Sequence, residues 1–256
     1  MVNNMGVKDY IETTAVFTIE EFKQEFPTVT GYNLLARAIK SGKVSQVTRG
    51  LYASATGRFV NVRHDRFKIA AKLAPDVSFA YHSALELLGV AHSLSSRVQY
   101  YSDMKRKEVV FCDNSYKQYH ASYEPIMLQT VRATAFGEVS VTTKEQTLMD
   151  CLYSIGRGGG TEEILRSIAS FQYIDVAAIK DRVVLLNSSS IARIGWVLEQ
   201  KREEWHVTEK DLNDFRNMLA GNGYRFIPGT TPETNWSNRW RLILPVPEEE
   251  MKDWLL

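Results

Sequence analysis

Three polar side chains share one side of a helix that the sequence predicts from residue 28 or 30 to residue 41. At 100° per residue, Asn33, Arg37 and Lys40 fall within about 60° of one another, and Tyr32 lies on their flank. The apolar side chains lie opposite this stripe: Leu34, Leu35, Ala38 and Ile39. An amide and a guanidinium near a helix N-terminus can hydrogen-bond adenine and guanine edges in the major groove. The alternative is the solvated face of an ordinary amphipathic helix.

The charge around this helix is uneven. Residues 26–64 contain no Asp or Glu, although the whole chain of 256 residues has 30. The same residues carry six cations: Arg37, Lys40, Lys43, Arg49, Arg58 and Arg63. Because the net charge of the chain is +1, the remaining residues carry −5. This asymmetry predicts an anionic partner for one segment, nucleic acid first, with chance fluctuation as the alternative.

The elements around the polar stripe predict a winged helix-turn-helix domain. They are helices over residues 5–13, 19–25 and 28–41, followed by β-like runs over residues 43–48 and 51–55. Thr18 and Glu21 form a capping box for the second helix, and Gly50 suits the tight turn between the β-like runs. Three helices and a hairpin within residues 1–57 are the layout of this DNA-binding domain.

The predicted DNA contacts come from the helix and the hairpin together. Lys43, Thr48 and Arg49 are expected to follow the phosphates, because they lie at the two ends of the first β-like run. The expected site is the set Tyr32, Asn33, Arg37, Lys40, Lys43, Thr48 and Arg49.

Residues 58–256 predict a larger mixed α/β domain, so we expect the whole chain to be an α+β protein. A linker or linking strand over residues 57–66 precedes short helices at residues 66–73 and 82–88. The β-rich segment 97–142 contains runs at residues 98–101, 109–111, 116–123, 127–133 and 139–141. The helical segment 143–220 has helix starts near residues 143, 161, 175, 188 and 208, and residues 239–244 predict a last strand.

Three groups of residues invite a catalytic or metal-binding interpretation. The glycine-rich residues 156–161 follow a predicted helix and lack the Gly-Lys-Ser/Thr end of a P-loop, which favours a turn. His82 and Glu86 stand four residues apart on a helix, but a single such pair is too few ligands for zinc. Glu199 and Lys201 match the end of a nuclease motif in type and spacing, and we expect them on a solvated helix face. We therefore predict no catalytic residues, no metal and no cofactor.

The cysteine and tryptophan residues point to packing. Cys112 and Cys151 stand far apart, and we expect both to be small core residues in a reducing compartment. All five Trp lie in the last 61 residues, where the chain from Glu203 onward has ten acidic and six basic residues. Core packing is the first explanation, and a protein-binding surface is the alternative.

From the distribution of apolar residues we expect neither a membrane-spanning helix nor a secretory signal. No run approaches the roughly 20 apolar residues of a spanning helix. Residues 1–5 have neither a basic start nor an apolar stretch. We expect a cytoplasmic protein with no membrane partner.

Three segments resemble the AbiEi family, the antitoxins of abortive-infection toxin–antitoxin systems. They are Thr48-Arg49-Gly50-Leu51-Tyr52; residues 70–89, around Ser78-Phe79-Ala80-Tyr81-His82; and residues 141–152, around Thr142-Thr143-Lys144-Glu145-Gln146. The resemblance extends from about residue 16 to about residue 170. Gln146 stands where the family usually has arginine, so a role that needs a cation there is not carried over.

The resemblance implies a winged helix over residues 1–57 that represses its own operon by binding inverted repeats in double-stranded DNA. It also implies that residues 58–256 neutralise a nucleotidyltransferase-like toxin of a type IV system, with no stable toxin complex assumed. We therefore expect a transcriptional autorepressor and antitoxin of antiviral defence that is not an enzyme. The alternatives are a nuclease targeted by the winged helix and a defence-system adaptor that binds protein.

Overall fold

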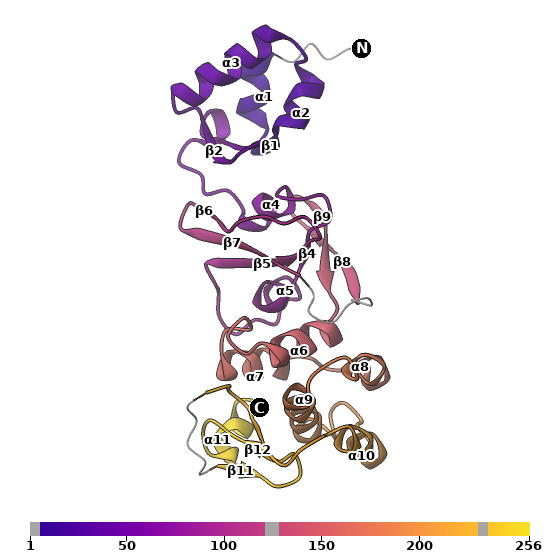
Figure 1. Cartoon of the computed structure of the whole chain (residues 1–256). Helices are drawn as coiled ribbons and strands as arrows, with labels where there is room; N and C mark the ends of the chain where they lie inside the picture. Colours follow the sequence, from indigo (N-terminus) through magenta and orange to yellow (C-terminus); the bar gives the residue numbers. More distant parts are fainter. Residues whose placement is uncertain (1–5, 121–127, 230–234) are drawn as a thin grey trace. The chain divides into compact units, whose positions relative to one another are not determined.

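The chain forms a mixed α+β protein of helices and several small sheets. The computed structural model describes residues 6–120, 128–229 and 235–256 (Figure 1). Two predicted β-like runs, 116–123 and 127–133, extend into residues 121–127, which lie outside the described residues, as do residues 1–5. None of the described helices is long and apolar enough to cross a membrane.

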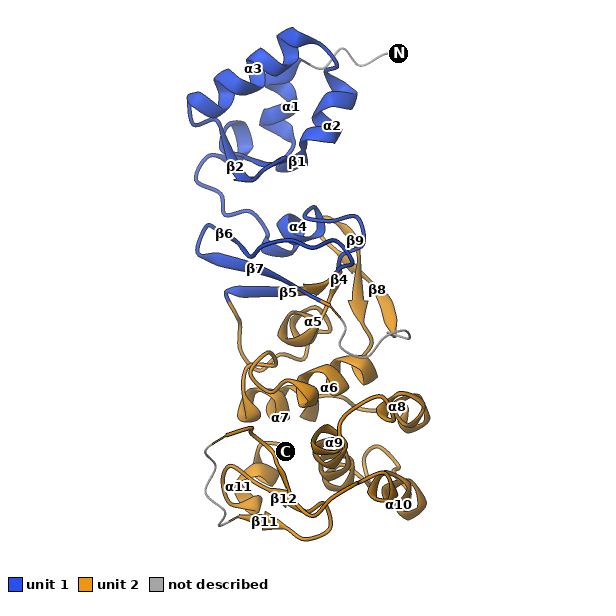
Figure 2. Cartoon of the chain, in the orientation of Figure 1, with its two compact units in different colours: residues 1–77, 96–98, 102–119 blue, residues 78–95, 99–101, 120–256 orange. Residues whose placement is uncertain are grey.

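The chain divides into two compact units (Figure 2). Unit 1 comprises residues 1–77, 96–98 and 102–119, and unit 2 comprises residues 78–95, 99–101 and 120–256. Unit 1 therefore continues past residue 57. The division of the chain at residue 57 into a DNA-binding domain and a second domain stays a prediction.

The first part of unit 1 packs three helices against a small sheet. Its elements are α1 (Val7–Thr13), β1 (Val16–Thr18), α2 (Ile19–Glu25), α3 (Val29–Lys40), β2 (Val44–Thr48) and β3 (Leu51–Ser54). The sheet has the order β1-β3-β2, and both pairings are antiparallel. Figure 1 shows α1, α2 and α3 on one side of this sheet. The three predicted helices and the hairpin are confirmed, and β1 is a third strand that the sequence did not predict.

Aromatic rings form the core of this part. The ring of Tyr10 meets those of Phe17, Phe22 and Phe26 edge-on, with centroids 5.3, 5.8 and 5.5 Å apart. Edge-to-face contacts at such distances are favourable beyond the area they bury. This core holds α1 and α2 against the strands, and Leu35 and Ala38 attach α3 to the same cluster.

Local signals explain where these helices begin and end. The Thr18 side chain accepts a hydrogen bond from the Glu21 N–H at 3.1 Å, and the Glu21 carboxylate accepts from the Thr18 N–H at 2.8 Å, so the predicted capping box is confirmed. The Thr28 side chain caps α3 by accepting from the Gly31 N–H at 3.1 Å. Gly42 follows α3 with φ of +73°, the left-handed conformation that ends many helices.

The rest of unit 1 contains a turn, a short helix and a hairpin. These are η1 (Gly57–Phe59), α4 (Arg66–Ala71), β6 (Val109–Phe111) and β7 (Asn114–Tyr119), together with the first residues of β5 (Arg97–Tyr101). Asp65 caps α4, because its carboxylate accepts hydrogen bonds from the N–H groups of Phe67 and Lys68. Cys112 is exposed in the turn between β6 and β7, with φ of 47°, so its predicted place in the core is wrong.

Unit 2 begins with strands that pair in the order β5-β4-β9-β8. The elements are β4 (Ser78–Phe79), α5 (Tyr81–Leu87), β8 (Gln129–Thr134) and β9 (Gly137–Thr142). Strand β4 pairs antiparallel with β5 and parallel with β9, and β8 pairs antiparallel with β9. The predicted β-rich character of residues 97–142 is therefore confirmed for the described residues.

The remainder of unit 2 is mainly helical. Its elements are α6 (Lys144–Tyr153), α7 (Thr161–Ala169), α8 (Val176–Val183), α9 (Ser188–Gln200), α10 (Glu209–Asn217), β10 (Tyr224–Arg225), β11 (Trp236–Ser237), β12 (Leu242–Ile243) and α11 (Glu248–Asp253). The predicted last strand over residues 239–244 is shorter in the structure. Arg241 has φ of 50°, which interrupts extended backbone just before β12.

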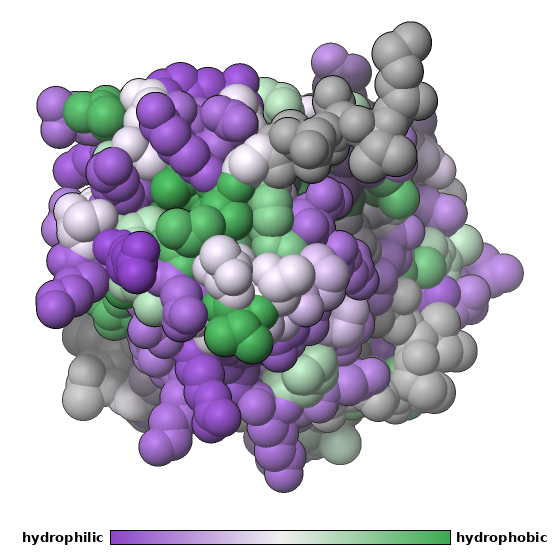
Figure 3. Space-filling model, turned by 90° about the horizontal axis from the view of Figure 1, so that it is seen from above, coloured by the Kyte–Doolittle hydropathy of each residue, from purple (hydrophilic) through white to green (hydrophobic). Residues whose placement is uncertain are grey.

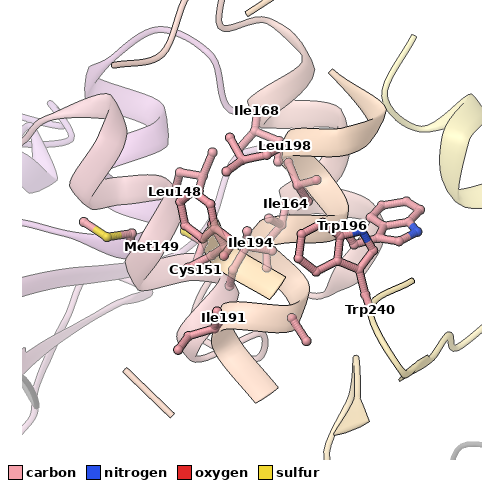
Figure 4. Packing of buried hydrophobic residues seen from close by; sticks show 14 of the residues in the cluster. Leu148, Met149, Cys151, Ile164, Ile168, Ile191, Ile194, Trp196, Leu198 and Trp240 are labelled. Atoms are coloured by element: carbon pink, nitrogen blue, oxygen red, sulfur yellow. The ribbon is translucent and has the colours of Figure 1, made fainter. Parts of the chain in front are cut away.

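The largest apolar core of unit 2 gathers side chains from α6, α7 and α9 (Figure 4). Trp196, Trp205 and Trp240 are fully buried, which confirms core packing for these three. Trp236 is 40% exposed. Most of the Trp content of the last 61 residues therefore stabilises the fold.

Candidate nucleic-acid interface

The polar stripe of α3 faces outward. Asn33, Arg37 and Lys40 are exposed, whereas Leu35 and Ala38 are 4% and 7% exposed and belong to the aromatic core. Tyr32 is half-buried against the same core. The predicted phase of this helix is therefore confirmed.

Leu34 departs from the predicted apolar face. Its side chain is 40% exposed, because it lies at the edge of the buried face rather than over its centre. Figure 3, which views the molecule from above, shows apolar surface next to hydrophilic residues. An exposed apolar side chain beside the polar stripe leaves a surface that mixes aliphatic and cationic groups.

A hollow of about 340 Å³ lies between α1 and α3. It is lined by Val7, Lys8, Ile11, Glu12, Leu34, Arg37, Ala38, Ser41 and Lys43. Two predicted site residues, Arg37 and Lys43, therefore line the same hollow, where Lys8 of α1 joins them. Sequence reasoning did not include Lys8, because acidic residues follow it and it lies outside residues 26–64, the segment without acidic residues.

Four of the six cations in residues 26–64 have no carboxylate partner within the residues that the structure describes: Arg37, Lys40, Lys43 and Arg49. The other two are engaged. Arg58 donates a hydrogen bond to the Thr13 carbonyl, and Arg63 lies 3.2 Å from the Asp113 carboxylate. An unpaired surface cation is free to neutralise a phosphate, which is the main source of affinity for DNA.

The hairpin turn lies apart from the hollow beside α3. Gly50 adopts φ of +82° in the turn, and its carbonyl accepts a hydrogen bond from the Ile19 N–H at 2.8 Å. Arg49 lines a separate hollow of about 580 Å³ together with Glu20 and Glu21. Thr48 is half-buried opposite Leu51. The structure therefore brings Arg37 and Lys43 to one hollow and Arg49 to another.

Charge is divided unequally between the two units. Unit 1 has 16 Lys and Arg against 10 Asp and Glu, a net charge of +6, and unit 2 has 15 against 20, a net charge of −5. The exposed stripe of α3 is therefore part of a basic unit. Such a distribution attracts polyanions to unit 1 over distances of about 10 Å at moderate salt.

The glycine-rich residues 156–161 form a turn between α6 and α7. The Gly160 N–H donates to the Ile155 carbonyl at 3.0 Å, and Thr161 is the first residue of α7. A Cβ at Gly158 would lie 2.6 Å from the Ile164 side chain. The close packing and the left-handed φ of 104° at Gly160 explain the glycines without a phosphate ligand.

His82 is enclosed by carboxylates rather than arranged as a metal ligand. Its Nδ1 and Nε2 lie 3.1 Å from carboxylate oxygens of Glu86 and Glu163. The same Glu163 carboxylate accepts from the N–H groups of His92 and Ser93 and thereby holds the loop after α5. Within the described ranges, no group of three or more His, Cys, Asp or Glu side chains could hold a metal ion.

Glu199 and Lys201 do not lie on a solvated face, contrary to the prediction. Lys201 is 8% exposed, pairs with Glu204 and donates to the Leu255 carbonyl at 3.3 Å. The Glu199 carboxylate accepts from the Trp240 Nε1–H at 2.6 Å. Both side chains are therefore engaged in contacts with later segments of the chain.

Comparison with known proteins identifies a fold rather than a family. No protein-family model and no curated protein matches the chain. Among solved structures, the chain is similar to the crystal structure of the RV2827C protein from Mycobacterium tuberculosis, with a TM-score of 0.68 at 13% sequence identity. The match covers 97% of this chain and 91% of that chain. The α+β fold is thus shared with that protein over almost the whole length.

Proposed function

We propose that the chain binds double-stranded DNA through a winged helix-turn-helix formed by α1, β1, α2, α3, β2 and β3. The order of these elements and the β1-β3-β2 sheet support this assignment. The observation that carries the proposal is the outward stripe of Asn33, Arg37 and Lys40 on one face of α3, with no carboxylate paired to either cation in the described part of the chain.

In this proposal α3 is the helix that enters the major groove. Arg37 is suited to guanine, whose O6 and N7 accept two hydrogen bonds from a guanidinium, and Asn33 is suited to adenine. Lys40, Lys43 and Lys8 neutralise phosphates beside the groove. Arg49 contacts a phosphate farther from the helix, because it lines a different hollow.

The direct test is binding of the full chain to DNA from the region upstream of its own gene. Fluorescence polarisation is measured at low salt, with a shuffled duplex of the same length as the control. We expect tighter binding to the upstream DNA by at least a thousandfold, the lower end of specific recognition. Equal affinity for both duplexes, or none for either, contradicts the proposal.

We further propose that DNA binding serves transcriptional autorepression and that unit 2 acts as an antitoxin. This part rests on the sequence resemblance to the AbiEi family together with the division into a basic and an acidic unit. The target is an inverted repeat in the promoter, and the functional partner is a nucleotidyltransferase-like toxin.

The antitoxin role is tested by co-expression with the neighbouring gene product. If that product is a nucleotidyltransferase-like toxin, we expect the full chain to restore growth. The Arg37→Ala variant should restore growth equally well while failing to repress a promoter reporter. Loss of growth rescue in Arg37→Ala, or no rescue by the wild-type chain, contradicts the assignment of the two roles to different units.

A further inference from the structure

The hollow between α1 and α3 has the size and the apolar lining of a small-molecule site. Its volume of about 340 Å³ lies within the range of ligand pockets, roughly 300–1,000 Å³. The apolar part of its lining is entirely aliphatic: Val7, Ile11, Leu34 and Ala38. Leu34 stays 40% exposed in a position where an alkyl chain would cover it. An alkyl chain fits this lining better than a polar ligand does, because burying apolar surface is favourable.

The charged groups around the hollow favour a ligand with a negative charge. The lining contains three basic residues, Lys8, Arg37 and Lys43, and one acidic residue, Glu12. Lys8 lies 4.0 Å from the Glu12 carboxylate, so the carboxylate is partly neutralised by its own helix. Arg37 and Lys43 have no carboxylate partner in the ranges that the structure describes. A ligand with one negative head group would place that group at Arg37 and Lys43 and its tail against Leu34.

We infer that this hollow binds a medium-chain alkyl carboxylate and that the bound carboxylate competes with DNA for Arg37 and Lys43. The competition rests on the proposed function, whereas the binding of the carboxylate does not. A ligand that occupies two DNA-contacting cations must weaken DNA binding, and DNA must weaken ligand binding by the same factor. The site would make repression sensitive to free alkyl carboxylates.

Binding of the alkyl carboxylate is tested on the full chain without DNA. Octanoate is titrated into the protein by isothermal calorimetry, with octanol and octylamine as probes of the same chain length. We expect binding of octanoate, at least tenfold weaker binding of octanol and none of octylamine. Equal binding of all three, or no binding of octanoate, overturns the inference, and both outcomes leave the DNA-binding proposal standing.

The Leu34→Ser variant tests the alkyl contact without removing a cation. We expect it to weaken octanoate binding about tenfold, because part of a leucine side chain is lost from the contact. The matched control is Val29→Ser, which removes an apolar side chain that is 74% exposed on the same helix but outside the hollow. Equal weakening by both substitutions would contradict binding in this hollow.

Competition between the carboxylate and DNA is tested by adding octanoate to the complex of the full chain with upstream DNA. Saturating octanoate should raise the Kd for DNA at least tenfold in the wild type and leave Leu34→Ser much less sensitive. Octylamine should have no such effect. If octanoate binds the free protein but leaves the Kd for DNA unchanged, competition is excluded. If the wild type binds no DNA at all, the proposed function fails while the calorimetric result still decides the ligand site.

Discussion

At the scale of single residues, His82 is a buried titratable group of unit 2 that lies between two carboxylates. Burial lowers the pKa of this imidazole, but the hydrogen bonds and charges of Glu86 and Glu163 outweigh burial and raise it above its ordinary value. Burial raises the pKa of Glu163, but hydrogen bonds from Ser93 and Ser167 and the charge of His82 lower it overall. The contacts of the His82 imidazole with the carboxylates of Glu86 and Glu163 therefore tie α5 to α7.

This arrangement predicts a pH dependence of stability. Because the folded pKa of His82 is raised, its contribution is fully present below the unfolded pKa of about 6.5 and is lost as the pH rises through the folded pKa. We expect the free energy of unfolding in urea to fall from pH 6 to pH 9 and to fall less in His82→Gln. The control is His92→Gln, whose exposed side chain should leave the pH dependence unchanged. A wild-type slope that survives in His82→Gln contradicts the assignment.

Arg37 is the residue on which base recognition depends in the proposed function. The Arg37→Ala variant should lose about 1–3 kcal/mol of binding to the specific site and discriminate less at one base pair. Binding of a random duplex should change far less. Competition binding against a set of single-base variants of the site measures this. Equal losses on specific and random DNA would instead make Arg37 a phosphate contact.

At the scale of elements, α9 and the segment leading into β12 depend on one close approach. A Cβ at Gly195 would lie 2.0 Å from a ring carbon of the fully buried Trp240. The indole cannot easily withdraw, because its Nε1–H is bonded to Glu199 at 2.6 Å. Glycine within a helix normally weakens it, so the residue is explained by this packing rather than by helix propensity.

The Gly195→Ala substitution therefore tests the packing of α9. In an exposed helix this change stabilises, whereas here we expect the free energy of unfolding to fall by about 1–3 kcal/mol through overpacking. Urea denaturation measures the change. The control is Gly156→Ala, where the added Cβ meets nothing within 4 Å and the backbone needs no left-handed conformation. A stabilised Gly195→Ala variant would contradict the close approach.

At the scale of the whole molecule, the unequal charge of the two units bears on how DNA is bound. The net charge of unit 1 is +6 and that of unit 2 is −5, so unit 1 is strongly basic although the whole chain is almost neutral. An acidic unit is repelled by phosphates. Contacts with DNA are therefore expected from unit 1 alone.

The salt dependence of binding measures how many phosphates unit 1 neutralises. With about four such contacts, the logarithm of the binding constant should fall against the logarithm of salt concentration with a slope near −3.6. Lys40→Gln should reduce the slope by about 1. Lys210→Gln, which removes an exposed cation of unit 2, is the control and should leave it unchanged. Equal effects of the two substitutions contradict a DNA surface confined to unit 1.

Much of the secondary structure was predictable, because its signals are local. The capping box of Thr18 and Glu21 and the stop at Gly42 act within a single turn of chain and need no distant partner. The outward stripe of α3 was predictable for a similar reason, since helical periodicity alone separates buried from exposed positions. The caps and the outward stripe therefore do not depend on where α2 and α3 lie in the folded chain.

Other features depend on distant contacts. The burial of Lys201 follows from its contact with the Leu255 carbonyl. The separation of Arg49 from Arg37 follows from the packing of the hairpin turn beside α2, and the same folding brings Lys8 to the hollow. No periodicity in the sequence encodes these neighbours.

The order of the elements, the α+β class and the outward side of α3 can be inferred from local sequence signals, because caps, turns and periodicity act over a few residues. Which cations share a surface, which of them pair with carboxylates and where a hollow remains are set by the packing of the folded chain. Those outcomes depend on which segments meet in space, and residues that meet here are separated by as many as 81 positions in the chain, as His82 and Glu163 are.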